Sequence, residues 1–193
     1  MAAWRSPVLV LGAALVLGAC SDAPPPSPTT EQAERVLDDL ERPASASFDL
    51  GSFDFSKPID GVASAEDGLL AGRSWDVYYV LDDGAVGAWG AGLDVFGSED
   101  AARASAERLA DYWVCAGPRE PLEIDVDGYD VLDASTCRRP TEEGYYATLS
   151  AADGPVTANL TLAAQDPEVA ATALRAVWES LSRSTRQAVD ALD

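Results

Sequence analysis

Two stretches of this chain share one pattern of apolar and polar positions. In each, two runs that alternate apolar and polar residues flank an Asp-Gly pair, and a run with the helical period of about 3.6 residues follows. Asp-Gly favours the tight turn of a β-hairpin, because glycine accepts the positive φ that such a turn requires. The pattern therefore predicts two hairpin–helix units, over residues 75–117 with a turn at Gly84 and over residues 145–181 with a turn at Gly154.

Shorter patterns predict the remaining elements. They are a helix over residues 31–42 with Thr30 as N-cap and Pro43 as stop, a strand with a bulge or bend near Gly51, a loop over residues 56–72, and a hairpin over residues 122–131 that turns at Gly128. Together these elements predict an α+β fold with an antiparallel twisted sheet and helices packed mainly on one face.

The first residues have the pattern of a signal peptide. Arg5 precedes an uncharged apolar run over residues 7–19, which is too short to span a bilayer, since spanning needs about 20 residues. Cys20 follows the small residues Gly18 and Ala19, and this segment resembles the lipobox of bacterial lipoproteins. The resemblance implies cleavage before Cys20, a diacylglycerol thioether on its sulfur and further acylation, with chains such as palmitate. The alternative is an ordinary secretory signal with Cys20 near the cleavage site.

Proline dominates the segment after Cys20. Four prolines within residues 21–30 favour extended polyproline II geometry and exclude a helix. We therefore divide the chain into a signal peptide over residues 1–19, a lipidated cysteine with a semi-rigid spacer over residues 20–30, and one globular envelope domain over residues 31–193. The predicted localisation is extracytoplasmic, with a lipid anchor in the cell membrane.

The chain is strongly acidic, with 33 Asp and Glu against 13 Lys and Arg and a formal net charge of −20. Such a charge repels nucleic acids and anionic lipid headgroups, so we expect no nucleic-acid partner. Basic partners, cations and neutral ligands remain open. Lys57 is the only lysine, and the bias toward Arg and Ala suggests an actinobacterial source.

Histidine is absent, which excludes Ser-His-Asp and Cys-His catalysis and histidine-ligated zinc. No cofactor motif is present, and we expect a protein that is not an enzyme and that needs no cofactor or resident metal. If Cys20 is lipidated, Cys115 and Cys137 form an even pair, which in an exported domain predicts a disulfide. The alternative is two reactive thiols.

Two groups of residues are candidates for ligand binding. Arg138 and Arg139 form a basic pair that could bind a carboxylate or phosphate, or could balance neighbouring acids. Tyr78, Trp89 and Tyr146 lie on predicted strands and could line a groove for a glycan or lipid-like ligand. The alternative is that helices or the loop over residues 56–72 cover these aromatic side chains.

Acids also surround the turn at Gly128. Asp125, Asp127, Asp130 and Asp133 could supply oxygen ligands to Ca²⁺, but the spacing of an EF-hand loop and its closing Glu are absent. We therefore expect these acids to face solvent.

The segment VFGSEDAARASAERLADYWVCAG resembles the long helix of the extracellular sensor domain of mycobacterial PknH-type Ser/Thr kinases and their lipoprotein relatives. Phe96, Trp113, Cys115 and Gly117 carry the resemblance, which extends over about residues 70–183. It implies ligand sensing at the cell envelope without catalysis.

These observations predict a lipid-anchored, non-catalytic binding or sensor-like module for a small ligand in the cell envelope. The alternative is a structural or interaction lipoprotein that engages another envelope protein through its acidic surface. A ligand pocket would favour the first hypothesis, and a flat acidic face would favour the second.

Overall fold

A computed structural model of the chain describes residues 27–40, 50–55, 64–80, 86–112, 114–124, 128–140 and 143–192, with side chains undescribed at 50–55, 76–80 and 86–89. Among these residues, no helix combines the length and the apolar character needed to cross a bilayer.

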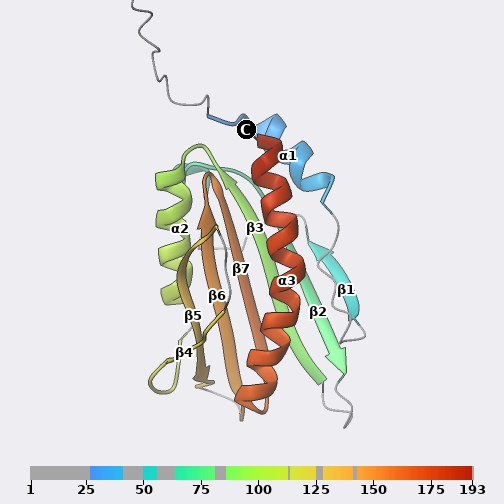
Figure 1. Ribbon diagram of the computed structural model, residues 1–193, viewed down its shortest axis with the longest axis vertical. Helices are drawn as coiled ribbons and strands as arrows, with labels where there is room; N and C mark the ends of the chain where they lie inside the picture. The colour runs from blue at the N-terminus through green and yellow to red at the C-terminus, as the bar shows by residue number, and fades with distance from the viewer. Residues whose placement is uncertain are drawn as a thin grey trace, which may run out of the picture.

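The described residues form one seven-stranded sheet in which every neighbouring pair of strands is antiparallel (Figure 1). The strand order is β1-β2-β3-β7-β6-β5-β4. In chain order the elements are α1 Thr30–Asp38, β1 Leu50–Phe55, the 3₁₀ helix η1 Ala65–Asp67, β2 Leu69–Val80, β3 Val86–Phe96, α2 Glu99–Tyr112, β4 Glu120–Pro121, β5 Asp130–Arg138, β6 Tyr145–Asp153, β7 Val156–Ala164 and α3 Pro167–Leu192.

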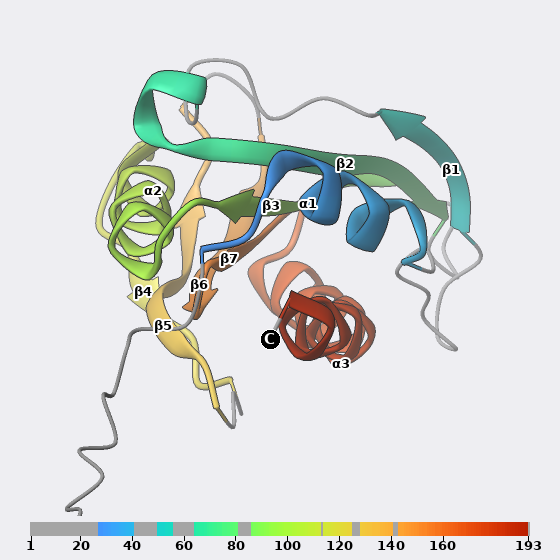
Figure 2. The ribbon, with the colours of Figure 1, turned by 90° about the horizontal axis from the view of Figure 1, so that it is seen from above.

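Helices cover both faces of the sheet, with β6 and β7 between α2 and α3 (Figure 2). Leu149 on β6 and Leu160 on β7 belong to the same buried cluster as Leu174 of α3. The next residue on β6, Ser150, points to the other face, where its Oγ donates to the Ala106 carbonyl of α2 at 2.7 Å. The helices α1 and α3 therefore share one face, and α2 packs against the opposite face.

The structure confirms the predicted α+β class and both hairpin–helix units. In the first unit β2 and β3 pair and α2 follows, and in the second β6 and β7 pair and α3 follows. Side chains cap both helices: Ser98 Oγ accepts from Ala101 N at 3.2 Å, and Asp166 Oδ1 accepts from Glu168 N at 2.8 Å. Two of the three helices share a face, as predicted, and the placement of α2 on the other face adds a second layer.

Four boundaries differ from the sequence prediction, and the first is the end of α1, which lies at Asp38 rather than at residue 42. Thr29, not Thr30, caps α1, because its Oγ1 accepts from Gln32 N while the Gln32 side chain accepts from Thr29 N, a reciprocal capping box. The expected loop over residues 56–72 ends early, since β2 begins at Leu69 and extends the pairing with β3. Gly128 has the positive φ of 89° that the predicted hairpin requires, but residues 122–124 form no strand, and β5 pairs instead with the short strand β4 that precedes them.

The face under α1 and α3 is apolar. Leu37 of α1, Trp75 of β2 and Leu181 of α3 are almost completely buried in one continuous cluster. Full burial of one such side chain contributes about 1.5–3 kcal/mol, so this face supplies the main driving force for folding.

The layer under α2 holds buried polar groups beside apolar residues such as Leu109. Asp94, Thr157 and Asn159 lie on the sheet and Ser105 lies on α2, each at most 5% exposed. Asp94 is the direct cross-strand partner of Thr157. Ser105 Oγ, Thr157 Oγ1 and Asn159 Nδ2 have no hydrogen-bond partner. Burial raises the pKa of Asp94 from 3.8 to about 7.

Gly92 lets the Asn159 side chain lie flat against β3. The two residues are cross-strand partners, and a Cβ on Gly92 would lie only 2.6 Å from Asn159 Nδ2 and 2.9 Å from Oδ1. The Asn159 amide lies beneath α2, so it has little freedom to move aside.

We expect Gly92→Ala to reduce the free energy of unfolding by about 1–3 kcal/mol, because the added methyl group collides with the buried amide. Gly97→Ala is the matched control, since the nearest atom to its added Cβ would be at 3.8 Å. Urea unfolding of the disulfide-intact domain measures both variants, and Gly92→Ala combined with Asn159→Ala should recover part of the loss. Equal stabilities of the two single variants would contradict the close approach.

Asp94 should make stability fall as pH rises from about 4 to about 7. In that range the unfolded chain has released the proton while the folded chain still holds it, so the folded state binds more protons. Asp94→Asn should remove this contribution and stabilise the protein at pH 8 by up to about 4 kcal/mol, since one pKa unit corresponds to about 1.4 kcal/mol. Urea unfolding at pH 5 to 8 measures the difference from wild type, with Asp130→Asn as the exposed control. If the free energy of unfolding of Asp94→Asn differs from that of wild type by the same amount at every pH, this account is refuted.

Candidate functional site

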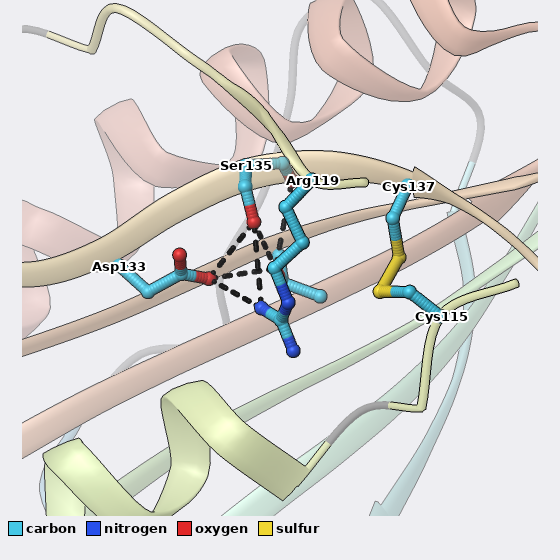
Figure 3. The surroundings of a disulfide bond; sticks show 6 residues. Cys115, Arg119, Asp133, Ser135 and Cys137 are labelled. Carbon is cyan, nitrogen blue, oxygen red and sulfur yellow. Dashed lines mark hydrogen bonds and ion pairs between the residues drawn. A yellow bond between two sulfur atoms is a disulfide. The ribbon is translucent and has the colours of Figure 1, made fainter. Parts of the chain in front are cut away.

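A disulfide fastens the segment after α2 to the sheet (Figure 3). Cys115 and Cys137 have their Cα atoms 5.7 Å apart and their sulfurs 2.09 Å apart, which confirms the predicted pairing. Trp113, which the sequence analysis singled out nearby, lies outside the described residues. A disulfide of this kind is typical of domains that fold outside the reducing cytoplasm.

A polar network lies beside the disulfide. Figure 3 shows Arg119, Asp133 and Ser135 turned toward one another. Asp133 Oδ2 accepts from Arg119 Nη1 at 3.0 Å, from Ser135 Oγ at 3.0 Å and from Thr148 Oγ1 at 3.1 Å. Because one carboxylate oxygen serves three internal donors, this network stabilises the junction of β4, β5 and β6 rather than presenting a binding surface.

The two described acids near Gly128, Asp130 and Asp133, pair with arginines of different segments. Asp130 pairs with Arg103 of α2, and Asp133 pairs with Arg119. Asp125 and Asp127 lie outside the described residues. Within the described part of the chain, no cluster of three or more acids or cysteines could hold a metal ion.

Among the ligand-binding residues that the sequence analysis selected, the structure brings Arg139 and Tyr146 together. The Arg139 guanidinium lies over the Tyr146 ring, 5.2 Å from its centroid. Arg138 is exposed and lines a separate hollow beside the disulfide. The backbones of Tyr78 and Trp89 lie on the paired strands β2 and β3, but their side chains lie outside the described residues.

A groove that the sequence analysis missed lies between α3 and residues 122–124. Its volume is about 400 Å³, within the range of small-molecule sites. Its α3 residues follow helical spacing, which places them on one side of the helix. The lining residues are Glu123, Ile124, Arg175, Trp178, Glu179, Ser182 and Arg186.

Glu123 and Ile124, which follow the short strand β4, form one wall of this groove. Leu122 N donates to the Ala134 carbonyl at 2.8 Å, after which the chain leaves the sheet edge. Leu122 and Ile124 pack against the margin of the core. Arg175 Nε then donates to the Glu123 carbonyl at 3.3 Å, which ties this wall to α3.

The floor of the groove is aromatic and held in place. Trp178 is 3% exposed, and the Tyr129 ring meets it edge to face at 5.4 Å between centroids. The Tyr129 hydroxyl donates to the Ser182 carbonyl at 2.7 Å, and burial raises the pKa of Tyr129, so the phenol stays protonated. The Arg186 guanidinium covers the same ring at 5.9 Å.

The exposed groups of the groove carry both signs of charge. Arg175 and Arg186 supply guanidinium groups, and Glu123 and Glu179 supply carboxylates. Glu179 pairs with Arg183 at 3.3 Å, whereas no ion pair engages Arg175 or Glu123 within the described residues. The Ser182 hydroxyl donates to the Glu179 carbonyl within the helix. This arrangement can bind a charged or dipolar ligand.

No protein-family model and no curated protein matches the sequence. Among solved structures, the chain is similar to the extracellular domain of PknH from Mycobacterium tuberculosis, at 14% sequence identity and a TM-score of 0.41. The match covers 84% of this chain and 90% of that domain. This structural similarity is weak.

Proposed function

We propose that this protein is a lipid-anchored, non-catalytic binding module of the cell envelope, and that the groove beside α3 holds a small ligand. The disulfide supports folding outside the cytoplasm. The signal-like leader, Cys20 and the proline-rich spacer support a domain tethered at the outer side of the membrane.

Arg175 is the observation that carries the binding proposal. Its Nε bond to the Glu123 carbonyl orients the guanidinium, and its terminal nitrogens form no ion pair within the described residues. Arg175 also borders a second hollow of about 510 Å³, so the two hollows meet at this residue. A guanidinium that is oriented but unpaired is suited to bidentate binding of a ligand carboxylate.

We expect Arg175→Gln to weaken binding of the groove ligand at least about tenfold, because loss of a charge-assisted hydrogen bond costs about 1.5–3 kcal/mol. A thermal-shift screen of envelope glycans, lipids, amino acids and peptides identifies the ligand, and calorimetry measures the variants. Arg35→Gln is the matched control, since Arg35 is an exposed arginine on α1.

If Arg175→Gln and Arg35→Gln bind the ligand with equal affinity, the ligand binds elsewhere and the groove is not the binding site. If only basic envelope proteins bound, with affinity that falls steeply as salt is raised, the result would favour an interaction lipoprotein that uses the net charge of −20.

We expect Cys20→Ala to release the protein from the membrane fraction, because the mature chain then lacks its acyl chains. Fractionation of cells that express the full chain measures the distribution, and mass spectrometry of the wild-type N-terminal peptide detects the lipid. A Ser21→Ala variant is the control. A wild-type protein that is cleaved but not acylated would overturn the anchor.

A further inference from the structure

We infer that the groove selects a zwitterion, a short peptide with a free ammonium and a free carboxylate. The inference rests on the proposed function, because it requires the groove to be the binding site. The charges that the groove presents indicate this chemical class of ligand.

The charge of the whole chain favours a neutral ligand. At a net charge of −20 the protein repels an anion before it reaches the groove. The groove itself holds two arginines and two glutamates, so its formal charges cancel. A ligand with one charge of each sign meets no long-range repulsion and can use both kinds of group.

Arg175 and Glu123 are neighbours that do not pair. The Nε bond from Arg175 to the Glu123 backbone holds the two residues together, yet no ion pair forms between their side chains. A ligand carboxylate can bind the terminal nitrogens of Arg175, and a ligand ammonium can bind the Glu123 carboxylate. One zwitterion would therefore give each of these two side chains a partner of opposite charge.

The other charged residues of the groove are already engaged. Arg186 lies over the Tyr129 ring, and Glu179 pairs with Arg183. Arg186 forms the far end of the groove, since it lies 11 positions after Arg175 on α3, about 16 Å along the helix axis at 1.5 Å per residue, whereas Glu179 lies only about one turn after Arg175. The recognition of charge is thereby assigned to Arg175 and Glu123.

The size and floor of the groove suit a dipeptide. Two extended residues span about 7 Å, which fits a groove of about 400 Å³. Ile124 is partly exposed and supplies apolar surface to the groove, whereas Trp178 is 3% exposed and adds little. A side chain of the ligand can rest on this surface, which favours a peptide such as alanyl-leucine over a free small amino acid.

Titration of the disulfide-intact domain with alanyl-leucine, its N-acetyl form and its C-terminal amide tests the inference by calorimetry. We expect each blocked form to bind at least about tenfold more weakly than the free dipeptide. Arg175→Gln should bind the free dipeptide and the amide equally, and Glu123→Gln should bind the free and N-acetyl forms equally. Arg35→Gln and Glu31→Gln, which alter an exposed pair on α1, should retain both preferences.

Three outcomes separate this inference from the proposed function. If the blocked dipeptides bind as tightly as the free one, selection of a zwitterion is refuted while groove binding stands. If no dipeptide binds, but another ligand does and loses affinity in Arg175→Gln, the ligand class is wrong and the proposed function stands. If no ligand depends on Arg175, both are refuted. Circular dichroism and the urea midpoint confirm that each variant is folded.

Discussion

The pairing of β3 with β7 is the constraint on which the rest of the structure depends. It joins the two hairpin–helix units into one sheet, and it makes both strands central. Its register places Asp94 opposite Thr157 and Gly92 opposite Asn159, so polar groups collect on one face. A shift by one residue would turn every side chain of one strand to the other face and exchange the apolar and polar layers.

The two faces of the sheet use different physical means to bind their helices. The apolar cluster holds α1 and α3 through burial of large side chains. The helix α2 rests on small and polar groups, including the hydrogen bond from Ser150 to Ala106, and the disulfide follows its C-terminal end. Unpaired buried atoms cost free energy, and three of them, on Ser105, Thr157 and Asn159, lie in the α2 layer.

The helix α3 connects the core to the candidate site. Leu174, Val177 and Leu181 face the sheet, while Arg175 and Arg186 on the other side border the groove. The apolar period in the sequence predicted this helix, but no candidate site was named on its polar positions. The groove forms because residues 123 and 124 lie beside this helix in the fold, although they are more than 40 positions away from it in the sequence.

The amino-acid sequence by itself determined the local features, because these depend on neighbours a few residues apart. They include the two hairpins, the caps of α2 and α3, the cysteine pair and the signal-like leader with Cys20, whose lipidation stays a prediction. Tertiary structure decided which helix covers which face, the burial of Asp94, and the meeting of Arg175 with Glu123. Those outcomes follow from the register of strand pairing and from packing between segments that are far apart in the sequence. The apolar period of one segment does not reveal which other segment will pack against it.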